Sequence, residues 1–145
     1  MRFMFYATFW STIIVLAVNV VSLFYTLSSK RYYGIQWFLS FITAQLLLTA
    51  TCGMTSERNS STMGIVMTMI VALFWAFSFT ISLWKGFSKV SISIIVVSTI
   101  GFMLLNGIGI WTIVLFSLHV LNSLVVTGHL YIAGKIMAPS YHQSS

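Results

Sequence analysis

Acidic side chains are almost absent from this sequence. Its 145 residues include a single acid, Glu57, and seven Lys and Arg residues, so that only 6% of the chain is charged. A soluble domain carries about 25% charged residues, and a chain of this length needs a polar surface to cover its core. The hydrophobic residues, 59% of the total, must therefore face something other than water, which indicates an integral membrane protein.

The scarcity of acidic residues and of cysteine also excludes several kinds of chemistry. One acid cannot form the carboxylate pair of a glycosidase or an aspartic protease, nor a carboxylate metal site. Cys52 is the only cysteine, so it forms neither an intramolecular disulfide nor a cysteine-based metal site. No serine lies in a G-x-S-x-G turn, and no glycine-rich phosphate loop is present. We therefore expect no enzymatic activity, no cofactor and no bound metal.

The net charge of +6 does not indicate nucleic-acid binding. Proteins that bind nucleic acids gather Lys and Arg on one face or along a stripe. Here the basic residues stand singly or in pairs between apolar runs. That placement is typical of membrane topology, and we expect no nucleic-acid partner.

Long apolar runs predict the fold. They are continuous, unlike the alternating strands of a membrane β-barrel, and most approach the length of about 20 residues that crosses a bilayer as a helix. The run that follows Lys89 is too long for one span, and Asn106-Gly107-Ile108-Gly109 is its natural break because Asn and Gly favour turns. The predicted helices are about 3–27, 35–53, 63–84, 89–105 and 110–134.

The fold class is therefore all-α, an integral membrane helical bundle of about five transmembrane helices. We expect a single transmembrane domain over residues 1–138, followed by a short polar tail at 139–145. Four spans are the alternative, if the segment near Asn106 enters the membrane and returns on the same side.

The basic residues predict an orientation. Cytoplasmic loops of membrane proteins carry an excess of Lys and Arg. With five spans, one side holds most of the basic residues, and the rule predicts an external or lumenal N-terminus and a cytoplasmic C-terminus. The cytoplasmic side would hold Lys30, Arg31, Lys85, Lys89 and Lys135, and the other side Arg2 and Arg58.

The external side would also hold Asn59, which begins the glycosylation sequon Asn59-Ser60-Ser61. The loop is short, so a glycan on Asn59 would lie against the bilayer. We interpret the sequon as a chance match.

Polar residues recur at helical spacing inside the predicted spans. His119, Asn122 and His129 share one face of the fifth helix, because the three positions, with Val126 between them, follow spacings of three and four. Polar residues within membrane helices usually face the bundle interior. The first helix has a similar stripe, Thr8, Thr12, Asn19, Ser22 and Thr26, and the second adds Gln36, Ser40, Thr43 and Gln45.

We interpret these stripes chiefly as interhelical hydrogen bonding, at about 0.6 kcal/mol for each bond. A polar pore is one alternative. A cofactor or proton role for the histidines is another, but His119 and His129 lie about 15 Å apart along a helix axis and cannot share one ion. A haem or redox subunit would need histidines from a partner chain.

The leading hypothesis for function is a small polytopic membrane protein that acts without catalysis, through helix–helix contacts. It would serve as an accessory subunit, an assembly factor or a self-associating component. Its partners would be the lipid bilayer and, within it, another protein or further copies of the chain. The alternative is a transporter or channel for a neutral or hydrophobic solute, lined by the stripes of the first and fifth helices. The predicted spans hold no charge in their interiors, which speaks against ion-coupled transport.

Overall fold

The computed structural model describes residues 2–29, 34–54 and 62–137, and it describes their side chains except those of 2, 27, 29, 34–37 and 133–137. Within these ranges the chain forms five α-helices and no strand. The helices are α1 Arg2–Ser29, α2 Gly34–Met54, α3 Thr62–Lys85, α4 Lys89–Asn106 and α5 Ile110–Met137. The all-α prediction is confirmed, and each helix lies within a few residues of its predicted range.

The break near Asn106 is also confirmed. α4 ends at Asn106, and Gly107 follows with φ +76°, a conformation that glycine adopts without steric cost. The Gly107 amide donates to the Met103 carbonyl over 2.7 Å, and the Thr112 hydroxyl of α5 donates to the Gly107 carbonyl over 2.8 Å. The amide and the carbonyl of Gly107 are therefore both hydrogen-bonded at the turn.

Four of the described helices are long and apolar enough to cross a membrane. The described apolar part of α2, Phe38–Met54, is shorter, although the whole helix has 21 residues and would span about 31 Å at the usual rise. The chain therefore fits an integral membrane protein, and the fifth span stays a prediction. The four segments are Phe3–Thr26, Thr62–Lys85, Lys89–Asn106 and Ile110–Ile132.

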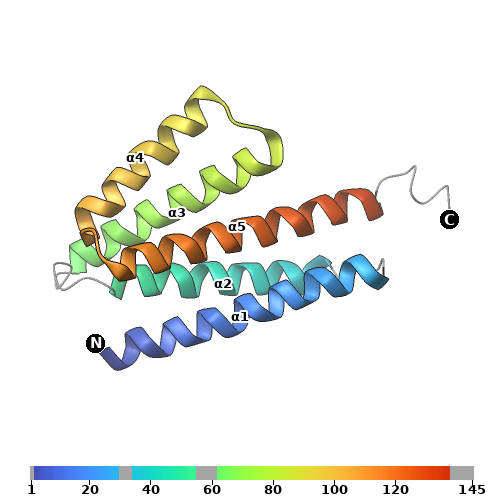
Figure 1. The fold of residues 1–145 in the computed structure, drawn as a ribbon, viewed down its shortest axis with the longest axis horizontal. Helices are drawn as coiled ribbons and strands as arrows, with labels where there is room; N and C mark the ends of the chain where they lie inside the picture. Colours follow the sequence, from blue (N-terminus) through green and yellow to red (C-terminus); the bar gives the residue numbers. More distant parts are fainter. Residues whose placement is uncertain (1, 30–33, 55–61, 138–145) are drawn as a thin grey trace.

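The helices form a layer with a hairpin beside it (Figure 1). α1, α2 and α5 pack against one another, α3 packs against both α2 and α5, and α4 packs along α3. Figure 1 shows α3 close to α5 where α3 begins and farther from it toward the α3–α4 turn. Toward that turn α3 stays linked to α5 by side-chain hydrogen bonds, from Thr80 to Ser123 and from Tyr131 to the Trp84 carbonyl.

Polarity is inverted relative to a soluble protein. Among the described side chains, fifteen buried residues are polar and eleven are hydrophobic, and large hydrophobic side chains cover the outside. A protein in water buries its apolar side chains and exposes its charged ones. The inversion is what a bundle surrounded by lipid requires, because polar groups are costly in hydrocarbon and find partners only inside the bundle.

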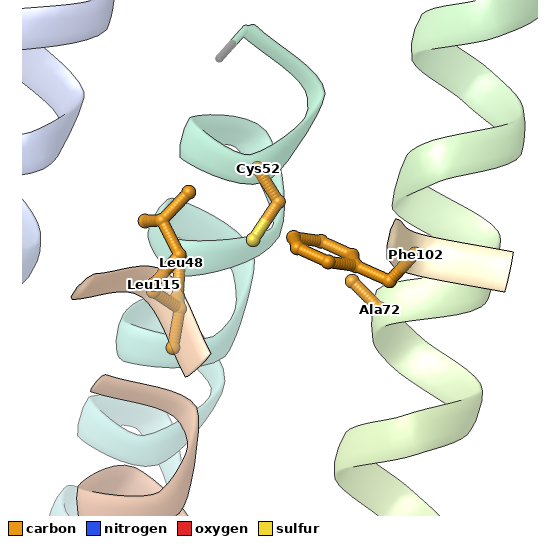
Figure 2. Packing of buried hydrophobic residues seen from close by; sticks show 5 residues of the cluster. All are labelled: Leu48, Cys52, Ala72, Phe102 and Leu115. Atoms are coloured by element: carbon orange, nitrogen blue, oxygen red, sulfur yellow. The ribbon is translucent and has the colours of Figure 1, made fainter. Parts of the chain in front are cut away.

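A small apolar cluster joins the hairpin to the layer. Phe102 of α4 reaches past Ala72 of α3 toward Cys52 of α2, with Leu48 and Leu115 beside them (Figure 2). All five side chains are almost fully buried. Four helices meet in this cluster, so it holds the hairpin against the other helices at a distance from the α3–α4 turn.

Candidate functional site

One polar cluster ties α1, α2 and α5 together. The Ser40 hydroxyl of α2 donates to Oδ1 of Asn19 in α1. Nε2 of His129 in α5 lies 3.2 Å from the Asn19 carbonyl oxygen and 3.3 Å from the Ser22 hydroxyl. The His129 ring also packs on Phe41 of α2, with ring centres 4.8 Å apart. Two residues predicted from separate stripes, Asn19 and His129, are thus neighbours inside the bundle.

A second cluster links α2 to α5 through two amides. Nδ2 of Asn122 donates to Oε1 of Gln45 over 3.1 Å. Nε2 of Gln45 donates in turn to the Thr49 hydroxyl oxygen over 3.1 Å. Asn122 is buried, and its Oδ1 has no hydrogen-bond partner among the described residues. The sequence predicted both Gln45 and Asn122 as polar interior residues but gave no reason to pair them.

The third cluster surrounds His119. Nε2 of His119 lies 3.3 Å from Sγ of Cys52, and the His119 ring meets the Trp75 ring at a steep angle with centres 5.6 Å apart. Helical spacing gave no sign of Cys52 as a partner, because the two residues lie on different helices. His119 and His129 belong to separate clusters, and no three metal-ligating side chains gather among the described residues.

Other predicted stripe residues have local roles. The Thr8 and Thr26 hydroxyls donate to carbonyls of their own helix, at 2.9 and 2.8 Å. Thr12 does the same over 2.7 Å, and its oxygen also lies 3.5 Å from that of Thr51 in α2. Thr43 is exposed and bonds only within α2 in the described structure. The Gln36 side chain and Asn59 lie outside the described part of the chain.

A cleft of about 400 Å³ is lined by residues of α2, α3 and α5. Its wall is almost wholly apolar and aromatic, and none of the described residues that line it is charged. Two hydrogen bonds join α3 to α5 near it: Thr80 donates to the Ser123 hydroxyl over 3.1 Å, and the Tyr131 hydroxyl to the Trp84 carbonyl over 3.5 Å. The lining residues are Phe38, Phe41, Ile42, Gln45, Leu46, Leu73, Ala76, Phe77, Thr80, Ile81, Trp84, Asn122, Val126 and Leu130.

The sequence missed this cleft. Its apolar lining consists of the same residue types that face lipid elsewhere, so composition does not distinguish the two. The one available signal in the sequence was the pair of amides Gln45 and Asn122. Phe41 lies one helical turn from Gln45, and Val126 lies one turn from Asn122; both also line the cleft. The cleft depends on the divergence of α3, which is a property of tertiary packing.

Comparisons with protein-family models, curated proteins and solved structures find no match to this chain. The class of protein is therefore defined by the fold and polarity alone. This is a small α-helical membrane protein with buried polar clusters at its helix contacts and an apolar cleft beside one of them.

Proposed function

We propose that this chain is a non-enzymatic, multi-pass membrane protein that binds a neutral hydrophobic molecule taken from the bilayer. The observation that carries the proposal is the cleft between α2, α3 and α5. Its volume of about 400 Å³ falls in the range of small-molecule sites, which are mostly apolar with a few placed polar groups. The absence of charge among its described lining residues favours an uncharged ligand.

The rim of the cleft favours entry from lipid. Phe38 and Phe77 line the cleft and are 59% and 63% exposed, so the rim continues into the apolar outer surface. Trp84 also lines the cleft and is the next-to-last residue of α3. The Lys85 ammonium lies 5.0 Å from the centre of its ring. Trp and Lys anchor helix ends at the membrane interface. With the predicted orientation, the cleft would open to the cytoplasmic leaflet.

The stripes of α1 and α5 are less suited to a solute path. Asn19 and Thr12 of α1 are fully buried, and His119 and His129 of α5 almost fully. These side chains contact neighbouring helices through the hydrogen bonds described above. The cleft offers a place for a hydrophobic solute without opening those contacts.

Photolabelling tests the proposal. The purified protein in phosphatidylcholine nanodiscs would be labelled with a long-chain alcohol that carries a diazirine, and the labelled peptides identified. We expect labels on α2, α3 and α5 around the cleft, and competition by the unlabelled alcohol.

A matched pair of variants sharpens the test. Ile81 lines the cleft and is 50% exposed, and Ile14 of α1 lies away from it and is 63% exposed. We expect Ile81→Trp to fill the cleft and reduce the labelling, and Ile14→Trp to leave it unchanged. Equal labelling of the two variants, or non-competitive labelling of the whole surface, would count against a binding cleft.

A second function, contact with another membrane chain, is favoured by α4. This helix packs along α3, and its Val97 and Leu104 side chains are 68% and 75% exposed. A helix covered on one side is suited to contact with a partner. The experiment is native co-purification in mild detergent with a measurement of particle mass. Val97→Trp should release a partner that Ile14→Trp retains, and a monomer of this chain alone would contradict this function.

A further inference from the structure

The walls of the cleft follow three helix axes. On α5 the lining residues Asn122, Val126 and Leu130 stand four positions apart, so they form a line along one face of the helix. The lining residues of α2, within 38–46, and those of α3, within 73–84, also recur at spacings of three and four. Each helix therefore contributes a lengthwise line of side chains, and the cleft is elongated parallel to the helices.

The cleft is about as long as one leaflet of a bilayer is deep. Its lining residues extend over eight residue steps on α2 and on α5 and over eleven on α3. At the usual rise per residue, the walls are about 12 Å long on α2 and α5 and about 16 Å long on α3. Half of the hydrocarbon core of a bilayer is about 15 Å thick. A lipid chain of one leaflet therefore has the length of the cleft.

The cleft begins at the membrane interface and ends near the middle of the bundle. Trp84 is the next-to-last residue of α3, and Lys85 beside it completes an interfacial anchor. α2 begins, and α3 and α5 end, on the same side of the molecule (Figure 1), so Phe38 lies toward that side as well. The other end of the cleft is lined by Leu46 and Leu73, and Leu73 stands halfway along α3. The cleft therefore covers the leaflet on the Trp84 side.

Volume and length together indicate a single chain. A methylene group takes about as much space as a water molecule in the liquid, roughly 30 Å³, so the cleft of about 400 Å³ holds about 13 of them. The zigzag of an extended alkyl chain advances about 1.3 Å per carbon, so about 13 carbons extend over about 16 Å. This is the length of the α3 wall. Two chains side by side would fill the same volume over only half that length.

We propose that the cleft holds one unbranched alkyl chain of a neutral lipid, extended along the helices, with the polar end of the lipid beside Trp84 and the chain end beside Leu46 and Leu73. Chains in the surrounding leaflet already lie in this direction. A chain therefore enters sideways past the exposed Phe38 and Phe77 without reorienting, which keeps the entropic cost of binding low. A fused ring body is wider than one chain and fits less well. This inference rests on the proposed function and specifies its ligand.

Chain length is tested first, because this test needs no variant. The protein in phosphatidylcholine nanodiscs is photolabelled with the diazirine alcohol, and straight-chain primary alcohols of increasing length compete at equal mole fraction in the bilayer. Each methylene missing from the cleft leaves a gap of about 30 Å³, which corresponds to a loss of up to about threefold in potency. We expect potency to rise up to about 13 carbons and then to level off, because longer chains extend past Leu46 into lipid.

Chain width is tested next. A methyl-branched alcohol and a sterol are compared with the straight-chain alcohol of about 13 carbons. A branch or a ring overfills a cleft that is one chain wide, and overpacking of this kind costs at least about fivefold in affinity. We expect both compounds to compete more weakly than the straight-chain alcohol by at least that factor.

Two substitutions on α2 locate the inner end of the cleft. Leu46 lines the cleft and Leu39 does not, and both side chains are exposed, so a larger side chain fits at either position. Leu46→Trp shortens the cleft, and it should move the length at which potency levels off to shorter chains. Leu39→Trp should leave that length unchanged.

Two photolabels determine the direction of the chain. A diazirine next to the hydroxyl group should label α3 around Trp84. A diazirine at the chain end should label α3 around Leu73, about 16 Å away along the helix. The reverse pattern, or one pattern with both probes, would contradict the proposed arrangement.

The failures are distinguishable. If no alcohol reduces labelling at the cleft, the proposed function itself fails. If alcohols compete but their potency does not depend on chain length, or keeps rising well beyond about 13 carbons, the cleft binds ligands and the single-chain inference is refuted. Equal competition by the branched alcohol or the sterol also refutes it, as does a levelling-off length that Leu46→Trp does not shift.

Discussion

The bond between Asn19 and Ser40 allows a direct measurement of how the bundle is held together. Asn19 of α1 is completely buried, and its Oδ1 accepts the Ser40 hydroxyl of α2. Nδ2 of Asn19 has no partner among the described residues. Asn19→Ala therefore has mixed effects: it breaks one interhelical bond, leaves a small void and removes an unsatisfied donor.

A double-mutant cycle isolates the bond from these other effects. Asn19→Ala, Ser40→Ala and the double variant are compared with the unchanged protein. Measured couplings inside membrane proteins average about 0.6 kcal/mol and reach about 1.7 kcal/mol. Complete burial of Asn19 keeps competing donors away, so we expect a coupling in the upper half of that range, a change of roughly seven- to eighteenfold in the unfolding equilibrium.

The assay is reversible unfolding in mixed micelles as the fraction of dodecyl sulfate rises, followed by tryptophan fluorescence. Ser11→Ala is the control on the same helix, because the Ser11 hydroxyl is exposed and bonds the Ala7 carbonyl over 2.7 Å. It should change the stability by less than about 0.5 kcal/mol. A coupling below about 0.3 kcal/mol, the scatter of independent sites, would show that the contact does not bind α1 to α2.

Three other variants and one chemical label test the packing. Gly53→Leu should lower stability, because even a Cβ there would stand 3.0 Å from a methionine side chain of α3. Gly101→Ala should raise stability by up to about 1 kcal/mol, because its Cβ makes an ordinary 3.6 Å contact. Unfolding midpoints measure both effects, and effects of the same sign would contradict the packing. Cys52 is fully buried and should react with maleimide only after unfolding, as mass spectrometry would show; rapid labelling of the native protein would disprove that burial. Thr99→Val removes the hydroxyl oxygen that accepts the Trp75 indole N–H over 3.0 Å. We expect it to lower stability by about 0.6 kcal/mol. An unfolding midpoint equal to that of the unchanged protein would mean that this bond does not hold α4 to α3.

The helices could be predicted because lipid imposes a simple rule. Every backbone group in the hydrocarbon must be paired within the chain, so the chain crosses as helices of a minimum length. The run after Lys89 was too long for one span and had to turn, and Asn106 and Gly107 were the residues best suited to the turn. Gly107 does take a positive φ there. Length and turn chemistry were enough to place these elements.

The pairing of helices could not be predicted in the same way. Helical periodicity alone placed Asn19, Asn122 and His129 on interior faces, and the structure buries all three. It did not reveal that Asn19 meets Ser40 or that Asn122 meets Gln45. In a bundle without charges inside its spans, no opposite-charge pair indicates which faces belong together. Shape decides the pairing, and shape depends on all five helices at once.

The buried polar residues separate into two groups with different consequences. Buried Thr and Ser residues commonly donate to a carbonyl one turn back in their own helix, as Thr68, Ser82 and Thr127 do at 2.7 to 2.9 Å. Such a hydroxyl has no proton left for a neighbour, so it acts as a small side chain that lets helices approach closely. Interhelical recognition then falls chiefly to the amides and imidazoles. By the same argument, a polar stripe of Thr and Ser is weak evidence for a water path.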